Sequence, residues 1–140
     1  VADWHRQEVR FYKRAQICVA DLHALFQGQG IGSLTGLAGL TAFADYKLPQ
    51  LLRRVGALVF ASELATQVDS YIQLSPGSEA EIEIRAATIW AVELLRRSLL
   101  ALSVTGVSRT ASEVDYRLWF ESQTHPPDER PYHRTRTIFY

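Results

Sequence analysis

Several features that usually identify a class of protein are missing from this 140-residue chain. It has no methionine, a single cysteine, and fifteen basic residues against fifteen acidic ones. One cysteine cannot form an internal disulfide, which favours a reducing, cytoplasmic environment. A formal charge of zero argues against a general affinity for the nucleic-acid backbone, which requires a basic excess or a basic face. Direct binding of nucleic acid is therefore not expected.

Long apolar runs and the common catalytic motifs are also absent. No run approaches the roughly 20 residues that span a bilayer, so we expect no membrane partner. CxxC, HExxH and GxSxG do not occur, and the four histidines (His5, His23, His125 and His133) lack metal-ligand spacing. We therefore expect neither a metal nor a cofactor. Val1 begins no targeting pattern, and we interpret it as an internal start of a longer polypeptide.

Apolar residues recur at helical spacing in the first part of the chain. Between residues 11 and 26 they are Phe11, Ala15, Cys18, Leu22 and Leu25, separated by four, three, four and three positions. This period predicts an amphipathic helix. Cys18 lies on its apolar side and is predicted to be a small core residue.

Proline and capping residues predict four further helices, one of which Ser62 can cap, with Glu63 near its positive end. Pro49 favours the first turn of a helix, which should run to about Gly56. Ser78, followed by acidic residues, begins the longest helix, which should reach about Leu102. That segment is apolar on nearly every face and should be central in its domain.

The last predicted helix covers about 111–122, where Thr110 and Glu113 form a T-x-x-E capping box. The long helix before it contains two i,i+4 pairs, Glu81 with Arg85 and Glu93 with Arg97, which we interpret as ordinary ion pairs. Strand-like alternation is almost absent. The sequence therefore predicts a single all-α domain over residues 1–140.

The first candidate site is the segment around Asp45, which lies between Phe43 and Tyr46 and shortly before Pro49. A carboxylate there is near the free N–H groups and positive dipole end of the following helix. Spacing alone favours a simpler interpretation, in which Asp45 caps that helix and the two aromatics belong to the core.

Two more candidates lie on predicted helices. Lys13 and Arg14 follow two aromatic residues, and such cations can hold a phosphate, although solvated charges are the simpler interpretation. Asp115 and Trp119 are four residues apart and share a helix face. They could form a carboxylate beside a ring that stacks on a base, but Trp119 as a core anchor is the commoner case.

The tail supplies the last candidates, Arg134 and Arg136, whose guanidinium groups can grip an anion. The alternative is an exposed polar end. Because the tail closes with three apolar or aromatic residues, 138–140, we expect it to dock back onto the domain.

Five segments together resemble the queuosine salvage family in their order and approximate spacing, from about Phe11 to Tyr140. They are FYKRAQ, LTAFADYKLPQLLRRVGAL, EIEIRAATIWAVELL, VDYRLW and the closing HRTRTIFY. Members of this family are considerably longer. The resemblance therefore implies that this chain is the carboxy-terminal part, with the amino-terminal half as its expected partner.

The resemblance also implies an all-helical fold similar to the helical DNA glycosylases. The implied activity is hydrolysis of the N-glycosidic bond of queuosine 5′-phosphate, a small-molecule substrate, to release queuine for tRNA modification. It assigns the catalytic role to Asp45.

The remaining roles that the resemblance implies concern substrate binding. Phe43 and Tyr46 would border the nucleotide, and Lys13 would hold its phosphate or ribose. Asp115 and Trp119 would belong to the base pocket, with Arg134 and Arg136 at the phosphate. Two alternatives stay open, a DNA-repair-type glycosylase and a non-catalytic helical module that binds a nucleobase.

Overall fold

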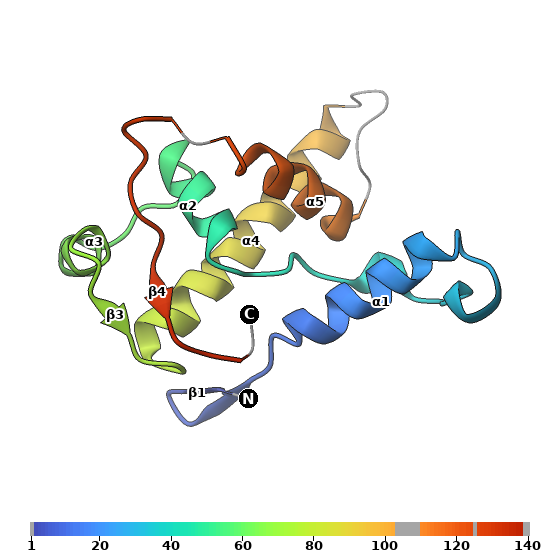
Figure 1. Ribbon diagram of the computed structural model, residues 1–140, viewed down its shortest axis with the longest axis horizontal. Helices are drawn as coiled ribbons and strands as arrows, with labels where there is room; N and C mark the ends of the chain where they lie inside the picture. The colour runs from blue at the N-terminus through green and yellow to red at the C-terminus, as the bar shows by residue number, and fades with distance from the viewer. Residues whose placement is uncertain (1, 103–109, 125, 139–140) are drawn as a thin grey trace.

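The computed structural model describes residues 2–102, 110–124 and 126–138, and these are mainly helical (Figure 1). The elements are β1 (Ala2–Trp4), β2 (Gln7–Val9), α1 (Lys13–Leu25), the 3₁₀ turns η1 (Gly30–Gly32) and η2 (Leu37–Gly39), α2 (Lys47–Arg54), α3 (Ser62–Asp69), β3 (Gln73–Leu74), α4 (Glu79–Ala101), α5 (Ala111–Glu121) and β4 (Arg134–Thr135). Within the described residues, no helix combines the length and the apolarity needed to cross a membrane.

The long helix α4 is central, as predicted. It contacts α2, α5 and β1, and α2 and α5 also contact each other (Figure 1). The core of this three-helix group consists of Ala42, Leu48, Val92 and Val114, with Ile89, Leu95, Leu99 and Leu118 packed around it. Burial of these side chains orients the loop before α2, which carries Asp45.

Helix α2 begins at Lys47, two residues before Pro49. Proline is tolerated there because the first N–H groups of a helix have no partner within the helix. The helix then ends at Arg54, close to the predicted end at Gly56.

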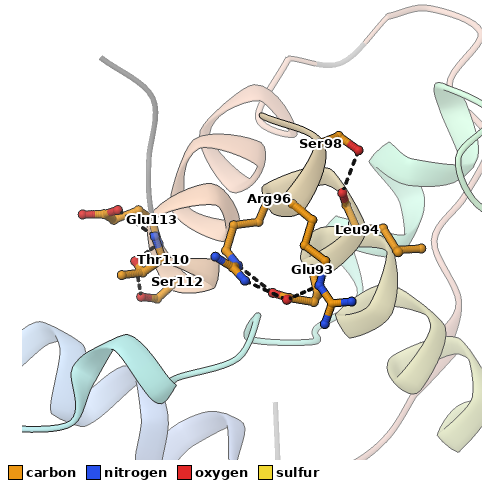
Figure 2. Close-up of polar contacts among 8 residues, drawn as sticks. Glu93, Leu94, Arg96, Ser98, Thr110, Ser112 and Glu113 are labelled. Carbon is orange, nitrogen blue, oxygen red and sulfur yellow. Dashed lines mark hydrogen bonds and ion pairs between the residues drawn. The ribbon is translucent and has the colours of Figure 1, made fainter. Parts of the chain in front are cut away.

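Polar side chains fix the beginning of α4 and α5, and both caps were predicted. The Ser78 hydroxyl accepts a hydrogen bond from the backbone N–H of Glu81. At α5, Thr110 accepts from the N–H of Glu113 at 3.2 Å, and the Glu113 carboxylate accepts from the N–H of Thr110 at 3.1 Å. Figure 2 shows this capping box beside the ion pairs that Glu93 makes on α4.

Four short strands depart from the all-α prediction. β1 and β2 form an antiparallel hairpin whose two turn residues, His5 and Arg6, both have positive φ. β3 and β4 pair in parallel, and the Arg14 guanidinium donates to the carbonyl of Ile138, so the described part of the tail docks onto the domain as expected. Strands of two or three residues are too short to show alternation in the sequence. Ile138 is exposed, and the last two residues of the predicted apolar end lie outside the described part.

Helix α1 matches its predicted position but not its predicted environment. None of its thirteen residues is buried, and in Figure 1 it extends away from the group formed by α2, α4 and α5. The prediction that Cys18 is a core residue is therefore wrong, because this side chain is exposed. Apolar periodicity shows which face of a helix needs cover, but it does not show that the cover is present in the same chain.

Candidate active site

Asp45 lies in the loop before α2 and is buried. Its Oδ1 accepts hydrogen bonds from the backbone N–H groups of Lys47, at 2.8 Å, and Leu48, at 3.0 Å. The interpretation that Asp45 caps this helix is thus confirmed. Because one oxygen serves both bonds, the cap fixes the carboxylate at the positive end of α2, where a negative charge is favoured.

Asp115, on α5, meets the same loop. Its Oδ1 accepts a hydrogen bond of 2.7 Å from the backbone N–H of Phe43. Burial raises the pKa of this carboxyl to about 7, with a smaller contribution from the charge of Asp45, while the Phe43 N–H and Lys13 act in the opposite direction. A carboxyl with a pKa in this range is suited to acid–base chemistry near neutral pH.

Lys13 brings a cation to these carboxylates from the first turn of α1. Burial lowers the pKa of its ammonium group, whereas the charges of Asp45 and Asp115 raise it and that of Arg85 lowers it. Lys13, Asp45 and Asp115 come from three segments far apart in the sequence. Their mutual electrostatic influence shows that folding gathers them into one cluster.

Arg85, on α4, is a central member of this region that the sequence interpretation missed. Its side chain and that of Glu81 are only 6% and 3% exposed, and their Nη1 and Oε1 atoms lie 3.1 Å apart. The Arg85 Nε donates to the carbonyl of Ala44 at 3.3 Å, and its guanidinium lies 4.0 Å from the centre of the Phe11 ring.

Glu81 and Arg85 are therefore not an ordinary surface pair. Arg85 joins α4 to the residue before Asp45 and to the segment that leads into Lys13. Their i,i+4 spacing predicted the ion pair but not the burial of its two side chains. The dense apolar surroundings of EIEIRAATIWAVELL were the available signal, because a charged pair inside an otherwise apolar helix is unusual.

The tail contributes His133, which is buried. Burial, with a smaller contribution from the nearby charge of Arg85, lowers the pKa of its imidazole to about 4. His133 is consequently neutral at physiological pH. Its position shows that the docked tail reaches the Arg85 region, which was expected only in general terms.

A cavity of about 340 Å³ opens beside this cluster, within the usual size range of small-molecule sites. Its polar lining includes Lys13, Glu81, Arg85 and Thr137, and its aromatic lining includes Phe11. Asp45 and Asp115 are buried and do not line it. Lys13 and Arg85 therefore line the cavity, whereas the two aspartates of the cluster do not.

The other predicted site residues lie at several places. The Phe43 backbone belongs to the cluster through its bond to Asp115. The Tyr46 ring packs on Tyr132 of the tail, with ring centres 4.7 Å apart. Trp119 is partly exposed rather than a buried core anchor.

The two tail arginines lie apart from the cavity lining. The Arg134 guanidinium stacks on the Tyr71 ring, 4.5 Å from its centre, and Arg136 is exposed. Neither residue lines the cavity that holds Lys13 and Arg85.

Comparison with known proteins adds to this geometry. The queuosine salvage protein family matches residues 1–140. The chain is 50% identical over its whole length to the queuosine 5′-phosphate N-glycosylase/hydrolase of Sphaerobacter thermophilus, covering 42% of that protein. Over 99% of its length it is 40% identical to the Mus musculus protein of the same description, covering 43% of it. The chain thus spans about two fifths of the length of these relatives.

Proposed function

Because the chain belongs to the queuosine salvage protein family, we propose that it takes part in hydrolysing the N-glycosidic bond of queuosine 5′-phosphate. The reaction releases queuine, which can be reused for tRNA modification in the cytoplasm. The observation that carries this proposal is the convergence of Asp45, Asp115 and Lys13 from three separate segments. Two carboxylates with different environments and one cation suit the cleavage of an N-ribosyl bond.

Asp45 is the proposed catalytic carboxylate. Cleavage of an N-ribosyl bond gives the sugar the character of an oxocarbenium ion, whose positive charge a fixed carboxylate stabilises. The two backbone N–H bonds to Oδ1 support this role, because they hold the carboxylate in one orientation before substrate arrives. Such preorganisation avoids the cost of reorienting the group during the reaction.

Asp115 is the proposed proton carrier at the base. Queuine is a 7-deazaguanine and has no N7 to protonate, so its developing negative charge must be stabilised elsewhere on the ring. A carboxyl with a pKa of about 7 keeps a proton part of the time at neutral pH and can donate it in a hydrogen bond. Asp45 would then face the sugar, and Asp115 would face the leaving base.

The phosphate is assigned to the cavity beside the cluster. Lys13 and Arg85 supply positive charge to its lining, and the Phe11 ring supplies an apolar wall. Phe43 and Tyr46 are proposed to border the nucleotide, and Trp119 to stack near the base. The exposed tail arginines, Arg134 and Arg136, would reach the phosphate only from the rim.

We further propose that residues 1–140 form one helical domain, similar to the helical DNA glycosylases and corresponding to the carboxy-terminal part of the longer relatives. Its partner would be the amino-terminal half of the family polypeptide. Neutral overall charge argues against duplex DNA as the substrate, because a repair enzyme needs a cationic binding face.

The test compares wild type with Asp45→Asn, with and without the amino-terminal half, and follows queuine release from queuosine 5′-phosphate by mass spectrometry. Asn caps helices about as well as Asp, so this change removes the charge and keeps the cap. We expect turnover to fall by at least about 100-fold, corresponding to roughly 2.7 kcal/mol of barrier. Asp69→Asn, at a carboxylate paired with Arg53 away from the cluster, is the control and should retain full activity.

The outcomes separate the three functions. Queuine release that depends on Asp45 supports the glycosidase. Binding of queuine without release from any combination would identify a non-catalytic nucleobase-binding module. Base release from duplex DNA, with binding that weakens steeply as salt increases, would identify a repair enzyme.

A further inference from the structure

Helix α1 presents an apolar face that no described part of the chain buries. Leu25 is 75% exposed, and Phe26 and Ile31 just beyond the helix are exposed as well. Isolated exposed apolar residues are common on protein surfaces, but contiguous apolar patches mark sites of interaction. The relevant observation is that several apolar residues of α1 line a common groove.

A groove runs along α1 and includes the exposed Leu25. Ile17, Cys18, Leu22 and Leu25 line it together with Ile138 from the tail, and its volume is about 980 Å³. Cys18, Leu22 and Leu25 follow the i, i+4, i+7 spacing of a single helix face. The Arg14 guanidinium donates to the carbonyl of Ile138 at 2.9 Å, which keeps the tail beside the groove.

We propose that this groove is the docking surface for the amino-terminal portion of the family polypeptide. The chain covers 42% of its Sphaerobacter thermophilus relative, so more than half of that protein's length lies outside the matched region. A segment of that size can supply an amphipathic helix, which commonly binds an apolar groove through residues at helical spacing.

The groove adjoins the cavity described above. Lys13 and Arg14 line both this groove and the cavity that contains Arg85. A segment seated along α1 would therefore lie beside Lys13. The inference rests on family membership and on the exposed face, and not on the proposed reaction, so the two can fail independently.

Cys18 provides a direct probe because it is the only cysteine in the chain. We would join the amino-terminal portion of the Sphaerobacter thermophilus relative to this chain and measure alkylation of the Cys18 peptide by mass spectrometry. A second thiol, introduced by Val59→Cys at a position that is 84% exposed, serves as the internal reference. In the 140-residue chain we expect the two thiols to react at similar rates.

In the joined protein we expect Cys18 to react at least tenfold more slowly than the reference thiol. Leu25→Asp should abolish this protection, while Val59→Asp, the matched change at an exposed apolar residue elsewhere, should leave it intact. Circular dichroism would verify that both variants remain helical. Equal reaction of both thiols in the joined protein would overturn the proposal. Protection of Cys18 in the 140-residue chain, with a dimer mass by light scattering, would overturn it by identifying a second copy as the occupant.

Discussion

Removal of the Arg85 side chain is the most demanding test of the structure. In the variant Arg85→Met, the Glu81 carboxylate, whose side chain is 3% exposed, loses its guanidinium partner. Breaking a buried ion pair from one side costs about 3–5 kcal/mol, because the remaining charge stays buried without compensation. Domains are stable by only about 5–15 kcal/mol in total, so this loss is a large fraction.

Urea denaturation measures this loss. With a dependence of about 2 kcal/mol per molar urea, the midpoint should fall by roughly 1.5–2.5 M. The double variant Glu81→Met/Arg85→Met removes both charges and should recover most of the loss, since apolar replacement of a whole buried pair is often neutral. Arg97→Met is the control, because Arg97 is exposed and pairs with Glu93 on the helix surface.

Two results would refute the reasoning. If Arg85→Met lowers the free energy of unfolding by less than about 1 kcal/mol, the Glu81 carboxylate must become solvated or protonated at little energetic cost. A double variant as unstable as the single one would assign the effect to the lost contacts of Arg85 with Ala44 and Phe11 rather than to the unpaired charge. Queuine release by the double variant would then test whether those contacts position Asp45.

Three further predictions concern pH and capping. The pKa of Asp115 is raised to about 7 in the folded state, so its contribution to stability is present below pH 4 and is lost as pH rises to about 7. Asp115→Asn should remove this loss in denaturation curves taken across that pH range. The pKa of His133 is lowered to about 4, so its contribution to stability is present above pH 6.5 and is lost as pH falls to about 4. His133→Gln should reduce this loss of stability at acid pH. An unchanged dependence of stability on pH would refute the shift. Thr110→Ala removes the capping hydroxyl of α5 and should cost about 1 kcal/mol by thermal or urea denaturation, whereas Thr110→Ser should cost little.

The sequence by itself determined the main helices and their caps. The T-x-x-E pattern at Thr110 and Glu113 and the serine at Ser78 specify helix beginnings through bonds that span only three residues. Such local interactions depend on spacing along the chain, which a sequence displays directly. The central position of α4 was equally accessible, because a helix that is apolar on several faces packs against several neighbours, although Trp90 and Leu94 on this helix are exposed.

Only the tertiary structure decided which residues meet. The proximity of Lys13, Asp45 and Asp115 depends on how α1, the loop before α2 and α5 pack, and no local pattern encodes it. The burial of Glu81 and Arg85 depends on the same packing, because i,i+4 spacing is identical on a solvent-exposed and on a buried helix face. Cys18 shows the converse. The apolar face of α1 was predicted correctly. Whether Cys18 is buried, however, depends on a neighbouring segment that the sequence of α1 does not specify. Apolar side chains are stabilised by any apolar partner, so they do not show where that partner lies.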